Sequence, residues 1–185
     1  ISTANLTVMQ TADFAKLTTD AIVALTTAQI GFFNANQLNA LSTSQINAIQ
    51  TADIANLAKT TVSGLSTATI TALSSAQVRA LDSSQLQALT STQLNALDSD
   101  QLAAVETADI AALTTAQVAT LASASAAMLS TDQIVALSTA QVKAMTSAQL
   151  NALDSAQLSA IETVDVAALT TAQLAKLATA SVAML

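Results

Sequence analysis

Histidine, cysteine, tryptophan, tyrosine and proline are all absent from this chain of 185 residues, which contains only two glycines. Without histidine or cysteine, the chain lacks the usual general base at neutral pH and any thiol nucleophile. The same absence excludes disulfides, thiolate metal sites and the side chains that most often ligate haem. No glycine-rich phosphate loop is present either. We therefore expect no enzymatic activity and no bound cofactor.

Basic residues and long apolar runs are also scarce. Five basic residues stand against twelve acidic ones, which gives a net charge of −7. Because a protein that binds nucleic acid needs clustered positive charge to neutralise phosphates, we expect no nucleic acid partner. The longest apolar run is the five residues Ala21 to Leu25, whereas a helix that spans a membrane needs about 20. We therefore expect no transmembrane segment.

What the chain does contain is a repeat of eight residues, and a search for repeats precedes any assignment of fold. The phrases TSAQLNAL, DSAQLSAI and ETVDVAAL follow one another directly from Thr146 to Leu169. The same octad can be traced 23 times from Ser2 to Leu185 without insertion or deletion, and only Ile1 is left over. We predict one continuous repeat array over residues 1–185, as a fragment of a longer chain.

The columns of the aligned octads separate apolar from polar positions. Position 8 is always apolar, position 5 is aliphatic in all octads except those of Phe14 and Ala126, and position 7 is Ala in fourteen. Position 2 is nearly always Ser or Thr, and position 4 is most often Gln. This pattern predicts that positions 5, 7 and 8 are buried and that positions 2 and 4 are solvated or cap helices.

Neither a continuous helix nor a series of β-strands explains the octad well. Eight residues at about 100° each would rotate the apolar face by about 80° per repeat, so a continuous helix would have no constant partner. A β-solenoid is the alternative, but the chain has no Asn-Gly or Asp-Gly turn and is rich in residues that are uncommon in strands. We predict an all-α solenoid of short capped helices, one per octad, and assume two octads per layer.

The start of each octad supports this assignment. Position 1 is Ser, Thr, Asp or Asn in sixteen octads, and Gln often follows three residues later, as in Thr146 with Gln149 and Asp154 with Gln157. That is the spacing of a capping box. In four octads position 1 is instead Gln or Glu and position 4 is Asp, and there we predict that the cap moves to the Thr at position 2. Such octads begin at Gln10, Gln50, Glu106 and Glu162.

A slower period is superimposed on the octads. Residues 106–129 match residues 162–185 at eighteen of 24 positions, 56 residues apart. One interpretation is recent tandem duplication. The other is geometric: seven octads complete a whole number of superhelical turns.

The only candidate metal ligands are carboxylates. The densest cluster is Asp98, Asp100, Glu106 and Asp109, which could form a weak Ca²⁺ site. The alternative, which we favour, is that these carboxylates only stabilise helix starts through the helix dipole. No catalytic residue is predicted.

The phrase LSTAQVKAMTSAQLNALDSAQL, from Leu137 to Leu158, resembles the octad arrays of very large bacterial secreted or cell-surface repeat proteins, which are often described as adhesins or haem-utilisation proteins. The resemblance implies an extracellular or cell-surface scaffold and transfers no haem ligand, since the chain has no His or Cys. We therefore expect a structural segment that forms a filament or an adhesin stalk and self-associates. The alternative is a binding module that presents one solenoid face to a peptide, a glycan or ice.

Overall fold

The computed structural model describes residues 5–6 and 9–185. From the second octad onward, each octad contains one short helix, and each helix label equals the number of its octad. The helices are α2 (Thr11–Phe14), α3 (Thr19–Val23), α4 (Thr27–Ile30), α5 (Ala35–Asn39), α6 (Thr43–Asn47), α7 (Thr51–Ala55), α8 (Lys59–Ser63), α9 (Thr67–Ala72), α10 (Ser75–Arg79), α11 (Ser83–Ala88), α12 (Ser91–Leu94), α13 (Ser99–Ala104), α14 (Thr107–Ala112), α15 (Thr115–Thr120), α16 (Ser123–Ala127), α17 (Thr131–Val135), α18 (Thr139–Ala144), α19 (Ser147–Ala152), α20 (Ser155–Ser159), α21 (Thr163–Ala168), α22 (Thr171–Leu174) and α23 (Thr179–Val182).

The predicted fold class is confirmed. The helices have four to six residues, and no strand occurs among the residues that the structure describes, so the β-solenoid alternative is not supported. Helices this short do not persist in water alone and depend on packing against their neighbours. Within the described ranges, no helix has both the length and the apolar character that crossing a membrane requires.

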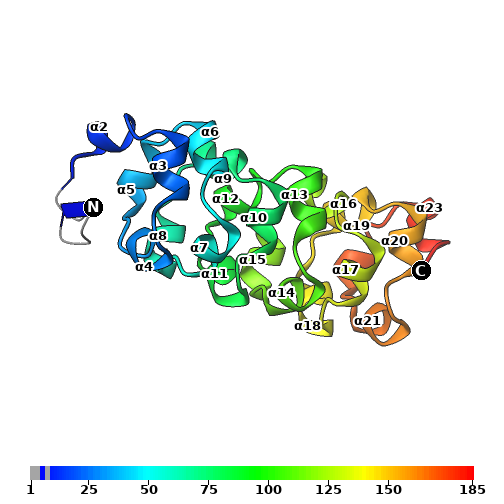
Figure 1. Ribbon diagram of the computed structural model, residues 1–185. Helices are drawn as coiled ribbons and strands as arrows, with labels where there is room; N and C mark the ends of the chain where they lie inside the picture. Colours follow the sequence, from blue (N-terminus) through cyan, green and yellow to red (C-terminus); the bar gives the residue numbers. More distant parts are fainter. Residues whose placement is uncertain (1–4, 7–8) are drawn as a thin grey trace. The chain divides into compact units, whose positions relative to one another are not determined.

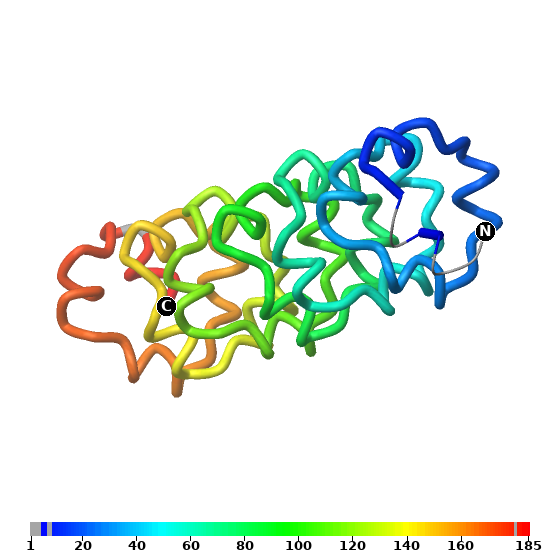
Figure 2. The backbone as a smooth tube through the Cα atoms, turned by 90° about the vertical axis from the view of Figure 1, so that its left-hand side faces the viewer, coloured from blue at the N-terminus to red at the C-terminus, as the bar shows by residue number. Residues whose placement is uncertain are grey.

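The chain divides into two compact units, Ile1–Leu97 and Asp98–Leu185. The division falls between two octads, and the predicted single array over residues 1–185 stays a prediction. Within each unit, a helix packs mainly on the helix three octads further along, as in α8 on α11 and α16 on α19. The backbone of each unit therefore coils so that segments three to four octads apart lie side by side (Figures 1 and 2).

The assumed layer of two octads is wrong, because one coil of the solenoid holds between three and four octads. Helix contacts join octads that are three apart. Side-chain hydrogen bonds, described below, join residues 28 to 31 positions apart. The 28-residue separation corresponds to three and a half octads, so two coils correspond to the 56-residue period of the sequence. The geometric interpretation of that period is thus compatible with the coil, and duplication remains compatible as well.

The core consists of positions 5 and 8. Side chains at position 5 from Phe14 to Leu158 are at most 3% exposed, and those at position 8 from Leu25 to Leu169 at most 9%. Burying a Leu, Ile or Val side chain contributes about 1.5–3 kcal/mol relative to leaving it in water, and the coil repeats this burial in each octad of these ranges.

One prediction about individual positions is wrong, and a second is right only in part. Position 7 is half-buried or exposed rather than buried, as at Ala80 and Ala96. Position 4 caps helices as expected, but it does not face solvent: Gln77 and Gln149 are each 1% exposed. A polar amide can be buried this completely only when its donors and acceptors are satisfied.

Candidate functional site

The capping box predicted for the octad start is present in the structure. Gln149 accepts a hydrogen bond through Oε1 from the Thr146 backbone N–H at 2.6 Å, and its own N–H donates to Thr146 Oγ1 at 3.2 Å. Asp154 and Gln157 form the same pair, with both distances 2.8 Å. Each box satisfies two of the backbone donors that the start of a short helix leaves unpaired.

The buried Gln side chain has a second function that the sequence analysis missed. Gln149 Nε2 donates to the carbonyl oxygens of Val118 and Leu121, both at 2.7 Å. These two residues belong to the fourth octad before that of Gln149. Gln77 reaches Ile46 and Ile49 in the same way, at 2.7 and 2.8 Å. In each case the Gln Nε2 donates to backbone carbonyls that lie 28 to 31 residues earlier in the chain. We call this set of hydrogen bonds the interlock.

The interlock repeats in both units. In the first unit it is formed by Gln37, Gln45, Gln77, Gln85 and Gln93, and in the second by Gln133, Gln141, Gln149, Gln157 and Gln173. A sequence signal for it exists, because position 4 is Gln thirteen times and never Glu. A capping box accepts either residue, but only the amide of Gln can also donate to a carbonyl.

Two octads with Thr or Ser at position 4, those of Thr69 and Ser181, use an asparagine instead. Ser66 begins such an octad, and its backbone N–H donates to Asn39 Oδ1 at 2.8 Å. Thr69 Oγ1 donates to the same oxygen at 2.7 Å, and Asn39 Nδ2 donates to the Gly64 carbonyl at 3.1 Å. Asn39 lies at position 6, four octads before the helix it supports. A residue from the preceding coil thus replaces the missing Gln.

The second unit contains the same arrangement. Asn151 accepts from the Ala178 N–H at 2.9 Å and donates to the Lys176 carbonyl at 3.0 Å. In the sequence, Asn95 stands midway between Asn39 and Asn151, 56 residues from each. The two asparagines that the structure shows in this role, Asn39 and Asn151, are thus separated by twice the 56-residue period.

Octads with Asp at position 4 differ again. The helices of these octads begin directly after the N-cap residues Gln50, Glu106 and Glu162, so the N-cap stays at position 1. None of these three caps forms a side-chain cap hydrogen bond. The predicted move of the cap to the Thr at position 2 is therefore wrong.

The aspartates of these octads are buried. Asp53 and Asp165 are 2% and 4% exposed, and one carboxylate oxygen of each has no hydrogen-bond partner. Because an unsatisfied buried polar oxygen costs about 1–3 kcal/mol, these aspartates are the least satisfied polar groups of the described core.

The predicted carboxylate cluster is spread over two octads. Asp98 caps α13 and accepts from the Gln101 N–H at 2.8 Å, and Asp100 lies exposed in the first turn of the same helix. Glu106 is the N-cap of α14, and Asp109 is buried in its first turn. In the part of the chain that the structure describes, no three acidic side chains gather as a possible metal site.

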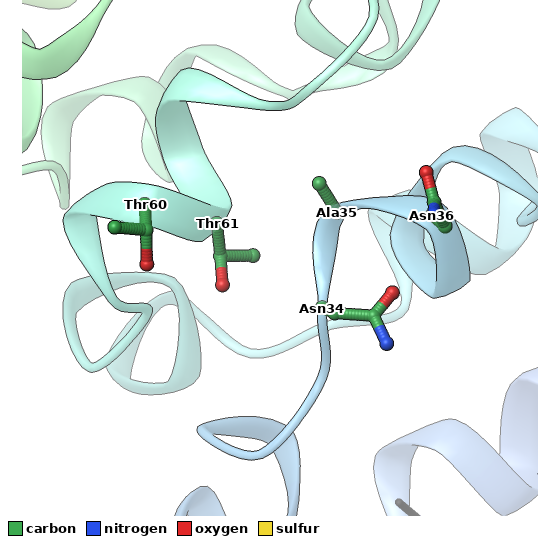
Figure 3. Close-up of a pocket in the computed structure, with 5 residues that line it drawn as sticks. All are labelled: Asn34, Ala35, Asn36, Thr60 and Thr61. Carbon is green, nitrogen blue, oxygen red and sulfur yellow. The ribbon is translucent and has the colours of Figure 1, made fainter. Parts of the chain in front are cut away.

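A small cavity lies in the first unit between the starts of α5 and α8 (Figure 3). It has a volume of about 310 Å³ and is lined by Asn34, Ala35, Asn36, Thr60 and Thr61. Asn34 Oδ1 accepts from the Gln37 N–H, and Thr61 Oγ1 donates to the Phe33 carbonyl, so part of the lining is already engaged in the fold. Its lining includes no charged or aromatic side chain, so no acid or base stands beside the hydroxyls of Thr60 and Thr61 to activate them.

The sequence model of the ALTTAQ repeat matches six overlapping or adjacent stretches of the chain. These are residues 6–43, 46–83, 61–91, 75–107, 102–139 and 134–161. The phrase ALTTAQ itself occurs at Ala24 to Gln29, Ala112 to Gln117 and Ala168 to Gln173. It comprises positions 7 and 8 of one octad and the capping box of the next. A comparison with curated proteins gives no match.

Proposed function

The chain belongs to the ALTTAQ repeat family, and we propose that it is a non-catalytic structural segment of a large bacterial extracellular or cell-surface protein. In that protein it acts as a filament-forming element or as an adhesin stalk. The observation that carries this proposal is the interlock. Each Gln of the interlock ties its octad to the coil before it, so that octads can be added without a new kind of contact, as in other solenoids.

Surface chemistry supports the same proposal. Charged residues are only 9% of the chain, and the cavity described above offers no catalytic group. A surface of small, weakly charged side chains opposes close packing with another copy less than a highly charged one does.

Exposed side chains in the last octads indicate where another copy could pack. Leu174 and Val182 occupy position 5, which is buried in the core octads, yet they are 44% and 51% exposed. In earlier octads this position is covered by helices further along the chain. Further octads, or a second copy of the chain, can cover the same apolar face and extend the coil.

Length scaling tests the structural proposal directly. Chains of 15, 19 and 23 octads can be compared by small-angle X-ray scattering. A spacer should gain a constant increment in maximum dimension per added octad, because each octad adds the same fraction of a coil. If the maximum dimension and the radius of gyration both grow only as slowly as those of a compact globule, the spacer function is refuted.

Self-association is a separate measurement. Sedimentation equilibrium over a wide concentration range should detect reversible association of the full chain. The double variant Leu174→Ser, Val182→Ser should weaken it, whereas Val135→Ser, which changes an equally exposed residue of α17, should not. A chain that stays monomeric at all concentrations would exclude filament formation through this face and leave the stalk function.

A further inference from the structure

The buried aspartates of the described core stand where other octads place a donor. In the octads on either side of Asp165, Gln157 donates to the Leu129 carbonyl and Gln173 to the Met145 carbonyl. The register of the coil places Asp165 opposite the corresponding carbonyl of the octad of α17, that of Leu137, two residues after the helix ends. Asp165 Oδ1 is buried and has no hydrogen-bond partner, and a carboxylate has no proton to donate.

A second carboxylate belongs to the same octad. Gln50, which occupies position 1 of the octad of Asp53, donates its side-chain amide to the Val23 carbonyl at 3.3 Å. A side chain at position 1 can therefore reach the position-6 carbonyl of the octad four before it. In the octad of Asp165, position 1 is Glu162, and the corresponding carbonyl is that of Val135. Glu162 thus adds a second acceptor and no donor.

The register of the coil predicts that four groups meet at this place, and all four are oxygen acceptors. Two carboxylates come from the start of α21, and two carbonyls come from the last turn of α17 and the residues after it. The carboxylate oxygen Asp165 Oδ1 is buried without a donor. A positive charge between these oxygens would therefore stabilise the arrangement.

We propose that Glu162, Asp165 and the backbone carbonyls of Val135 and Leu137 form a Ca²⁺ site that joins α21 to α17. Ca²⁺ takes six to eight oxygen ligands, including carboxylates, carbonyls and water, in flexible geometry. Water supplies the remaining ligands, because Glu162 is exposed. The ion replaces the interlock at this octad. Mg²⁺ fits less well, since it demands near-ideal octahedral geometry and releases water reluctantly.

The first unit provides an internal comparison. The octad of Asp53 carries Gln50 in place of Glu162, so it has one carboxylate and a donor already bonded to the carbonyl. We expect no Ca²⁺ site there.

Calorimetric titration of the chelator-treated full chain with CaCl2 tests the proposal, together with thermal unfolding followed by circular dichroism. Ca²⁺ at a concentration of about 100 times its Kd should raise the Tm by about 5–10 °C. The same concentration of Mg²⁺ should raise the Tm much less. In Asp165→Gln, the glutamine restores the interlock, so this variant should unfold at a higher Tm than the parent chain in chelator and should show no Ca²⁺ effect. The exposed control Asp132→Asn should keep the full Ca²⁺ response.

Three results would overturn the proposal. The first is the absence of saturable Ca²⁺ binding to the parent chain. The second is unchanged binding in Asp165→Gln, which would mean that Ca²⁺ binds elsewhere on the acidic surface. The third is a Tm in chelator that rises as the pH is lowered, with no response to Ca²⁺, which would identify a proton as the occupant.

Discussion

Gln149→Glu is the substitution that best separates the interlock from the capping box. Glutamate has the same shape and can still accept from the Thr146 N–H. It cannot donate to the Val118 and Leu121 carbonyls, each of which Gln149 Nε2 approaches to 2.7 Å. Two lost hydrogen bonds account for about 2 kcal/mol. A buried charge that faces carbonyls adds to this loss, so we expect a total decrease of about 3 kcal/mol or more in the free energy of unfolding.

Two control variants complete this experiment. Thr146→Ala removes only the side-chain cap and should cost about 1 kcal/mol. Ala148→Ser changes an exposed residue of the same helix and should lie within about 0.5 kcal/mol of the parent chain. Urea unfolding followed by circular dichroism at 222 nm provides the free energies. If Gln149→Glu costs no more than Thr146→Ala, the interlock contributes nothing and the reasoning is wrong.

The pH dependence of the same variant provides a second check. Burial beside two carbonyls should raise the pKa of a glutamate at position 149 above its unfolded value. The penalty is then fully present above the folded pKa and decreases as the pH falls toward the unfolded pKa, because a protonated carboxyl can donate to a carbonyl. The stability gap between Gln149→Glu and the parent chain should therefore narrow on acidification.

Three further predictions concern single residues. Gly64→Ala should destabilise the chain, because the new Cβ would lie 2.7 Å from a methyl group of the preceding coil. At Gly31 a Cβ meets only backbone oxygens at 3.4 Å or more, so Gly31→Ala should be neutral or stabilising by up to about 1 kcal/mol. Thermal unfolding of both variants tests this pair of predictions. Asn39→Ala should cost about 2–3 kcal/mol in urea unfolding, since three hydrogen bonds are lost. The backbone hydrogen bond from Gln85 lowers the pKa of Asp82 below its ordinary value of 3.8. The ionised Asp82 therefore stabilises the fold above its unfolded pKa, and this stabilisation is lost as the pH falls through its folded pKa. Asp82→Asn should remove this pH-dependent part of the stability from acid unfolding curves.

The sequence predicted the local part of this structure well. A Ser, Thr or Asp with Gln three residues later is a complete local signal, so the caps at Thr146 and Asp154 could be predicted without knowledge of the coil. The apolar positions 5 and 8 were also clear, because no other position is so uniformly large and apolar. Position 7 was misjudged because small apolar residues suit a half-exposed place as well as a buried one.

The missed features depend on which octads meet. The second function of Gln149 requires carbonyls 28 and 31 residues away, and the octad period alone does not fix that distance. Polarity was taken as a sign of solvent exposure, although a fully satisfied amide can be buried. For the same reason, the buried aspartates were interpreted only as residues of helix starts, although Asp53 and Asp165 each leave an oxygen without a partner.

The spacing of the interlock also determines how such a chain can fold as it is synthesised. The interlock of Gln37, for example, joins it to the carbonyls of Leu6 and Met9, so it cannot close until Gln37 itself has left the ribosome. Where no coil has yet formed, closing a loop of 28 residues costs about 3 kcal/mol of chain entropy. An octad that meets a coil already formed closes only its own eight residues onto that coil. A run of octads should therefore need one slow step to form its first coil. Folding should then follow synthesis octad by octad, one coil behind the growing end.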